Sequence, residues 1–264
     1  MPARYSRPCR ESRRNLRAQR GDADEKNACD FFRLLYISAM HADAATPSSF
    51  PWAHQLVCLA PLAVTLGLLC VFVGTDDAVT AAFARIGAEY PVLTSVMREL
   101  SRVVPFFFYA AYGIVLLRAA LTKNRPLLRF ALVFFLAQAC FAFLLVRVIK
   151  ISAGLPRPYA VLNGAEAAPF SFMDTDQHSF PSGHTAAVAL SVSCTASVFR
   201  KYALSLLLGL LLALLGFSRI YLLMHHLSDV AAGMCIGAAG NVFIHSICSR
   251  RTPRFIPQRP PFAS

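Results

Sequence analysis

The chain has 264 residues, of which 56% are hydrophobic and 15% are charged, and its mean hydropathy is +0.51. Soluble domains average about 25% charged residues, and here the apolar residues gather into long runs, which predicts a polytopic membrane protein. The formal net charge of +12 does not indicate a nucleic-acid partner, because the basic residues fall mostly in tails and short connections between those runs. The eight cysteines include no C-x-x-C pair, so they indicate neither a zinc site nor a disulfide framework.

In chain order, residues 1–55 are polar and rich in arginine, which predicts a disordered cytoplasmic tail. A domain over residues 56–248 follows, in which six apolar runs predict an all-α bundle of six transmembrane helices. The runs lie at roughly 56–74, 103–122, 128–149, 184–200, 203–224 and 229–248. The fourth run is short and rich in Ala, Ser and Thr, which favours a helix buried among the others. Residues 249–264 form a second basic cytoplasmic tail.

Lysine and arginine are concentrated in the two tails and in the connections at 118–129 and 200–201. The positive-inside rule therefore places both termini in the cytoplasm. Three polar clusters then fall on the opposite, external face. They are Lys150 to Pro158, Pro181 to His184, and Ser218 to Asp229. We expect these clusters to form one site.

The clusters contain three cations suited to a phosphate group: Lys150, Arg157 and Arg219. Phosphoryl transfer depends mostly on positioning and on electrostatic stabilisation, and arginine contacts phosphate oxygens in a bidentate manner. Snorkelling to the membrane surface is the alternative for each cation. That alternative suits Arg219 poorly, because Arg219 is the only charged residue between Tyr202 and Leu223.

The second cluster predicts the start of a helix, with Ser182 as its N-cap and Gly183 allowing close approach of an anion to the backbone. Free amides at a helix start bind phosphate, although an ordinary cap gives the same pattern. In the third cluster His225 and Asp229 are spaced i, i+4, which places them on one face if a helix has begun there. The carboxylate would then fix the imidazole tautomer for nucleophilic attack, and His184 would act as general acid.

Other titratable residues near the clusters are weaker candidates. His226 is expected at the membrane interface. His178, Asp174 and Asp176 are expected in a solvated connection, with lining of the substrate entrance as the alternative. No group of His, Asp or Glu resembles a metal cage, and the proposed chemistry needs no metal or other cofactor.

At these residues the chain resembles the type 2 phosphatidic acid phosphatase superfamily, which also includes the vanadium haloperoxidases. The family signature K-x6-RP, PSGH and SR-x5-H-x3-D is matched in all three parts, from Lys150 to Asp229. The resemblance implies that His225 forms a phosphohistidine, that Asp229 orients it and that His184 protonates the leaving group. It further implies that the phosphoryl oxygens are bound by five residues, namely Lys150, Arg157, Ser182, Gly183 and Arg219, without a metal.

The resulting prediction is a six-helix membrane phosphatase that acts on a lipid phosphomonoester or pyrophosphate. Phosphatidic acid, phosphatidylglycerol phosphate, undecaprenyl pyrophosphate and lipid A phosphate all remain open, as does the oligomeric state. The short chain favours a bacterial inner (plasma) membrane, with the site on the periplasmic face. Two alternatives are a vanadate-dependent haloperoxidase, which the apolar runs disfavour, and a non-enzymatic lipid transporter or scaffold.

Overall fold

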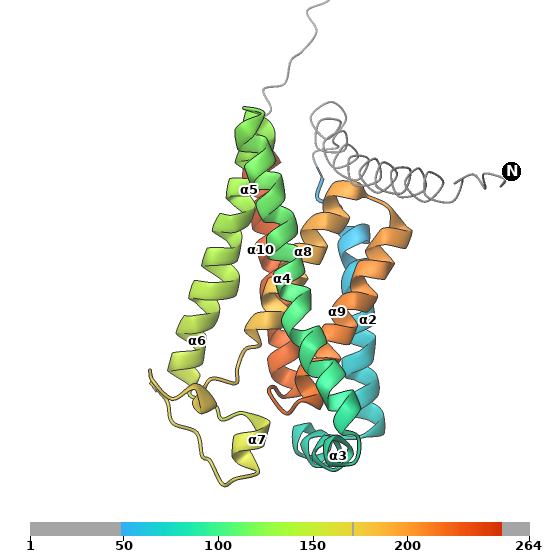
Figure 1. The fold of residues 1–264 in the computed structure, drawn as a ribbon, viewed down its shortest axis with the longest axis vertical. Coiled ribbons are helices and arrows are strands. Elements are labelled where there is room, and N and C mark those ends of the chain that lie inside the picture. The colour runs from blue at the N-terminus through green and yellow to red at the C-terminus, as the bar shows by residue number, and fades with distance from the viewer. Residues whose placement is uncertain (1–48, 171, 250–264) are drawn as a thin grey trace, which may run out of the picture. The chain divides into compact units, whose positions relative to one another are not determined.

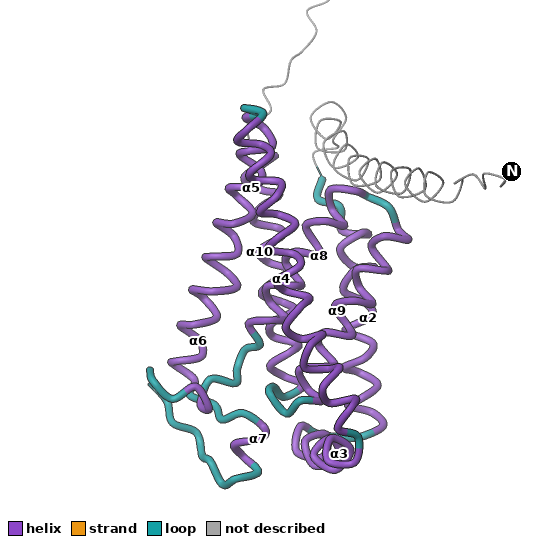
Figure 2. The backbone as a smooth tube through the Cα atoms, in the orientation of Figure 1, coloured by secondary structure: helices purple, strands orange, loops and turns teal. Residues whose placement is uncertain are grey.

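The computed structural model describes residues 49–170 and 172–249. The chain separates into two compact units, Met1–Ala45 and Thr46–Ser264, and every described residue belongs to the second unit. Most of the two predicted tails, 1–55 and 249–264, therefore lies outside the described residues. Within the described residues all regular structure is helical and no strand is present (Figure 2). The predicted all-α class is confirmed for this part of the chain.

The helices follow one another through the bundle shown in Figure 1. The α-helices are α2 (Trp52–Phe72), α3 (Asp76–Glu89), α4 (Pro91–Leu121), α5 (Arg125–Ala137), α6 (Val146–Ala153), α7 (Pro158–Val161), α8 (Gly183–Phe199), α9 (Tyr202–Tyr221) and α10 (Leu227–Ser249). A π-helix, η1 (Gln138–Leu145), joins α5 to α6 without a break, and the 3-10 turn η2 (Thr175–Gln177) precedes α8.

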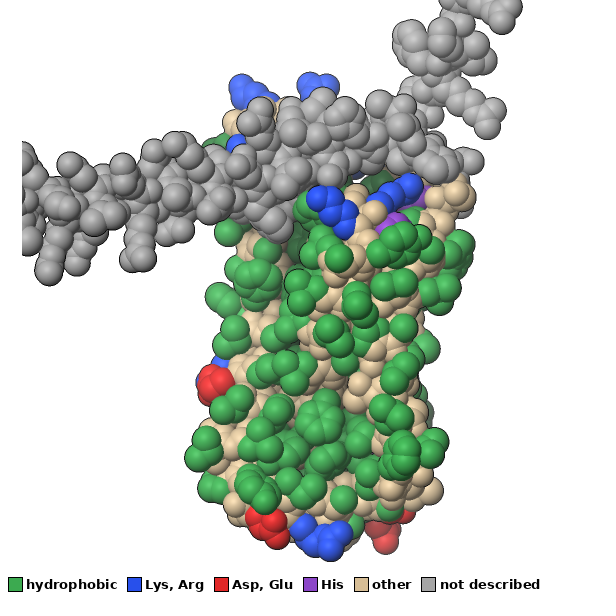
Figure 3. Space-filling model, turned by 90° about the vertical axis from the view of Figure 1, so that its right-hand side faces the viewer, with side chains coloured by type: hydrophobic (Ala, Val, Ile, Leu, Met, Phe, Trp, Pro, Cys, Tyr) green, Lys and Arg blue, Asp and Glu red, His purple; other side chains and the backbone are tan. Residues whose placement is uncertain are grey.

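Five helical segments of the described chain are long and apolar enough to cross a membrane. They begin at Trp52, Pro91, Arg125, Tyr202 and Leu227. The predicted fourth span is the 17-residue helix α8, which is apolar but shorter than the other five. Residues 185–194 of α8 are all buried, because small side chains let neighbouring helices pack closely around it. The face in Figure 3 is covered mainly by hydrophobic side chains, with charged groups gathered chiefly near its ends.

Residues 75–102, for which the apolar pattern predicts no element, are also helical. Two acidic residues, Asp76 and Asp77, open α3, where negative charge stabilises a helix start. Pro91 opens α4 at the position where proline costs no hydrogen bond, so α4 begins well before the predicted residue 103. The apolar run alone missed both features because these turns are too polar to resemble a span.

Candidate active site

The first cluster lies at the end of α6 and the start of α7. Lys150 extends from α6, and its Nζ donates to the carbonyl oxygens of His178 at 2.5 Å and Ser179 at 3.1 Å. The backbone N–H of Arg157 donates to the carbonyl oxygen of Asp176 at 2.8 Å. The side chain of Arg157 places Nη1 3.8 Å from Sδ of Met224, which belongs to the third cluster. The first cluster is therefore tied to the connection before α8 and to the one between α9 and α10.

The second cluster starts α8 as predicted. Ser182 is the N-cap, since its Oγ accepts a hydrogen bond from the Thr185 N–H at 3.4 Å, and Gly183 is the first helical residue. The Ser182 N–H donates to the Asp229 carbonyl oxygen at 2.9 Å. A Cβ at Gly233 of α10 would lie 2.5 Å from the Ser182 carbonyl oxygen, so this close packing requires glycine. His184 is exposed at the first turn of α8.

The third cluster spans the end of α9 and the start of α10. Arg219 is buried in the last turn of α9, and its Nη1 donates to Oγ of Ser101 on α4 at 2.7 Å. His225 precedes α10, which begins only at Leu227, so the condition under which His225 and Asp229 would share one helical face is not met. The pair is close nevertheless, because the turn before α10 brings His225 Nδ1 to 3.4 Å from Asp229 Oδ2.

Two carboxylates fix the start of α10. Asp229 Oδ2 accepts hydrogen bonds from Ser179 Oγ at 2.5 Å and from the His226 N–H at 2.9 Å. Asp76 of α3 accepts from the Leu227 N–H at 2.7 Å through Oδ1 and from Ser228 Oγ at 2.9 Å through Oδ2. Negative groups at a helix N-terminus satisfy free amides and oppose the helix dipole. This arrangement holds the backbone that immediately follows His225.

The three cations act electrostatically on one another and on His184, and two of them, Lys150 and Arg219, also act on His225. Arg157 and Arg219 interact with Lys150, and all three cations interact with His184. Burial lowers the pKa of His225 to about 3. Arg219 and Lys150 also lower this pKa, whereas Asp229 raises it. The imidazole is therefore neutral near neutral pH. With Nδ1 turned toward Asp229, Nε2 is the nitrogen left for attack.

The predicted site residues thus come together, but one neighbouring assignment is corrected. His178, expected in a solvated connection, is buried, and its Nδ1 lies 3.3 Å from Nη1 of Arg147. The expectation failed because this connection folds back onto α6. Three further residues were not predicted: Ser179, Asp76 and Ser101. Ser179 stands beside the second cluster in sequence, whereas Asp76 meets its partners across 151 residues, so no local pattern marks it.

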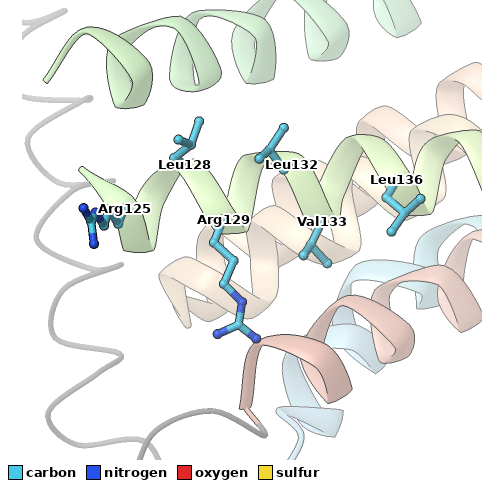
Figure 4. A pocket seen from close by; sticks show the side chains of 6 residues that line it. All are labelled: Arg125, Leu128, Arg129, Leu132, Val133 and Leu136. Atoms are coloured by element: carbon cyan, nitrogen blue, oxygen red, sulfur yellow. The ribbon is translucent and has the colours of Figure 1, made fainter. Parts of the chain in front are cut away.

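No group of three or more His, Cys, Asp or Glu suited to holding a metal occurs among the residues in the described ranges. An open pocket of about 280 Å³ lies along α5 (Figure 4). Its lining consists of Arg125, Leu128, Arg129, Leu132, Val133 and Leu136, none of which is a predicted site residue. Arg129 donates to the carbonyl oxygen of Ile247 at 2.7 Å, so it ties α5 to α10.

The fold and the site define a helical membrane protein in which a cluster of cations surrounds a neutral histidine beside a carboxylate. Residues 126–253 match the model of the PAP2 superfamily, and this part of the chain belongs to that superfamily. The match contains all three clusters, whereas Asp76 and Ser101 lie outside it. Comparison with curated proteins and with solved structures gave no match. The match supports a phosphoric ester hydrolase.

Proposed function

We propose that the chain is an integral membrane phosphatase that hydrolyses a lipid phosphomonoester or pyrophosphate through a phosphohistidine at His225. The observation that carries this proposal is the buried imidazole placed 3.4 Å from Asp229 in the field of Lys150 and Arg219. A neutral imidazole keeps the lone pair that a nucleophile needs. The adjacent carboxylate stabilises the positive charge that the ring gains when it is phosphorylated.

In the first step the phosphoryl oxygens bind to Lys150, Arg157 and Arg219, together with Ser182 and the amide of Gly183. These groups offset the negative charge that would otherwise repel a nucleophile. His225 Nε2 forms a bond to phosphorus while the bond from phosphorus to the leaving oxygen breaks. His184 gives a proton to that oxygen, and the negative charge of the bound phosphoryl group offsets the three cations that otherwise disfavour the protonated ring.

In the second step a water molecule replaces the departed group. His184, now neutral, takes a proton from the water as the water oxygen attacks phosphorus. The bond from phosphorus to Nε2 breaks, its electron pair returns to the ring, and inorganic phosphate is released. His184 is again protonated and His225 is again neutral, so the cycle closes without a further reactant.

A lipid substrate is supported by the helices long and apolar enough to span a membrane, because the proposed site lies at the ends of three of these segments. Phosphatidic acid, phosphatidylglycerol phosphate, undecaprenyl pyrophosphate and lipid A phosphate present the same reacting group. The distribution of Lys and Arg supports cytoplasmic termini and a site on the periplasmic face of a bacterial inner membrane. Reporters fused to each terminus test this orientation, and an external C-terminus would contradict it.

The test of the function is phosphate release by the purified protein from a panel of these four lipid phosphates, with and without EDTA. We expect turnover of at least one lipid and the same rate in EDTA. Strict dependence on added magnesium would contradict the metal-free route. Bromide oxidation that depends on added vanadate, without phosphate release, would instead favour the haloperoxidase alternative.

A further inference from the structure

Three large apolar side chains are exposed in the connection between α7 and α8. Phe170 is 69% exposed, Phe172 is 63% exposed and Met173 is 93% exposed. We call these three residues the apolar lip. Exposure of so much apolar surface to water is unfavourable by about 25 cal/mol for each Å², and such patches mark contacts with partners or membranes.

The backbone beside the apolar lip is hydrogen bonded to the end of α6. The Ala168 N–H donates to the Gly154 carbonyl oxygen, and the Phe170 N–H donates to the Ile151 carbonyl oxygen, both at 2.8 Å. Gly154 has a φ of +53°, and a Cβ there would lie 1.9 Å from the Ala168 carbonyl oxygen. Only glycine therefore permits this approach, which holds the apolar lip at the end of a spanning segment.

The apolar lip is hydrogen bonded to a helical segment that is long and apolar enough to span a membrane and that exposes large apolar side chains. Phe143, Leu144 and Val148 are exposed on the spanning segment formed by η1 and α6. Arg147 lies on the same segment, and its Nη2 donates to the Phe172 carbonyl oxygen at 3.2 Å. A cation beside exposed apolar side chains matches the boundary of a bilayer, where acyl chains meet phosphate headgroups.

The same connection also reaches the site. A few residues after Met173, the carbonyl oxygens of His178 and Ser179 accept hydrogen bonds from Lys150. The Asp176 carbonyl oxygen accepts from the Arg157 N–H. Two of the three cations are therefore hydrogen bonded to the segment that carries the apolar lip, so a headgroup held beside the lip is near the phosphate-binding groups.

We propose that the apolar lip inserts into the bilayer leaflet on the side of the site and passes the phosphate headgroups of lipids to Lys150 and Arg157. This inference rests on the proposed phosphatase function. The partner of the apolar lip is then the surrounding leaflet. The preferred substrate is a phosphate ester whose acyl or prenyl chains lie in that leaflet. Soluble phosphate esters would reach the same cations without using the lip.

Insertion is tested directly by fluorescence, without any need for activity. Trp52 is the only tryptophan, so a Trp52→Phe, Phe172→Trp protein reports on one position. In vesicles whose lipids carry a quencher near the headgroup end of the acyl chain, we expect strong quenching and little effect of iodide in the water. Quenching by iodide alone would overturn the proposal. Because this readout does not involve catalysis, it also separates failure of the lip from failure of the proposed function.

The functional test uses the triple variant Phe170→Ser, Phe172→Ser, Met173→Ser in vesicles. We expect kcat/KM for a lipid phosphate in the bilayer to fall by about tenfold or more, chiefly through KM, because the lip no longer partitions into lipid. Turnover of water-soluble p-nitrophenyl phosphate should be unchanged. The control is Tyr90→Ser, Val92→Ser, which removes exposed apolar groups at the α3–α4 junction. Equal losses on both substrates, or the same loss in the control, would overturn the proposal.

Discussion

The buried polar groups of the spanning bundle and those of the site differ in whether they have hydrogen-bond partners. Within the bundle, Asn241 Nδ2 donates to Gln55 Oε1 at 2.7 Å and to Ser197 Oγ at 2.9 Å. In the same way Gln138 Nε2 donates to the Ala187 carbonyl oxygen at 3.1 Å and to Ser191 Oγ at 2.9 Å. These groups satisfy one another across helices, as buried polar groups normally do.

At the site, several buried polar atoms have no hydrogen-bond partner among the described residues. Most of the unpaired atoms lie at or beside the three clusters, and Ser193 Oγ in α8 is the exception. Those near the clusters are Arg157 Nε, Gln177 Oε1, Arg219 Nε and His226 Nδ1, together with His225 Nδ1, which lies 3.4 Å from Asp229 Oδ2 without meeting hydrogen-bond geometry. An unpaired buried polar atom costs about 1–3 kcal/mol, so the fold tolerates a local loss of stability where an anion is to bind. The comparison predicts that site substitutions change activity and bundle substitutions change stability.

The largest effect is expected for His225→Ala. We expect turnover to fall by at least about 10³-fold, because removing a nucleophile abolishes the covalent route. Phosphate release from a lipid substrate measures the loss, and thermal unfolding shows that the protein still folds. His245→Ala, at the far end of α10, is the matched control and should keep its activity. Normal release by the His225 variant would remove the proposed nucleophile.

Arg219→Gln sharpens the contrast between activity and stability. Loss of one charge that stabilises the transferring phosphoryl group should lower kcat by about 10²-fold. Thermal stability should change little, because loss of the hydrogen bond from Arg219 to Ser101 is offset by removal of a buried cation whose Nε is unpaired. Both are measured on the same purified sample. A lower unfolding temperature with normal turnover would show that Arg219 is structural instead.

Asp76→Ala should have an intermediate effect on activity, since it leaves the Leu227 N–H and the Ser228 hydroxyl without their acceptor. Loss of such a cap costs about 1 kcal/mol and loosens the backbone beside His225, so we expect kcat to fall by about fivefold with little change in KM. Asp77→Ala removes the neighbouring charge in the same turn of α3 and is the control. Equal losses in both variants would indicate a general effect of charge.

The smallest effect on turnover is expected for Asn241→Leu. This change leaves Gln55 and Ser197 without their shared donor, so it should lower the free energy of unfolding by about 1–3 kcal/mol. Activity per folded molecule should stay the same, because the network lies away from the clusters. Unfolding in detergent and phosphate release together check this. Loss of activity without loss of stability would break the proposed division between bundle and site.

Much of this organisation follows from local sequence, and the rest depends on long-range contacts. The apolar runs predicted the spanning helices, and Ser182 was predicted as the cap of α8 because a cap depends only on residues within one turn. The start of α10 was predicted to within two residues, but the contacts that fix it, from Asp76 and from Ser179 through Asp229, were not, because they join residues far apart in sequence. The helices at 76–102 were missed because their polar turns carry no apolar run. The burial of His178 likewise depends on the fold of its connection onto α6.

The central claim is that phosphorus becomes bonded to His225 during turnover. The most direct measurement is a rapid quench of the enzyme with a lipid phosphate radiolabelled on phosphorus. Alkaline denaturation, which preserves phosphohistidine, and peptide mapping then locate the label. We predict label on the peptide that contains His225 within a single turnover, and none in His225→Ala. Label on a different residue, or the same label in the His225 variant, would contradict the account.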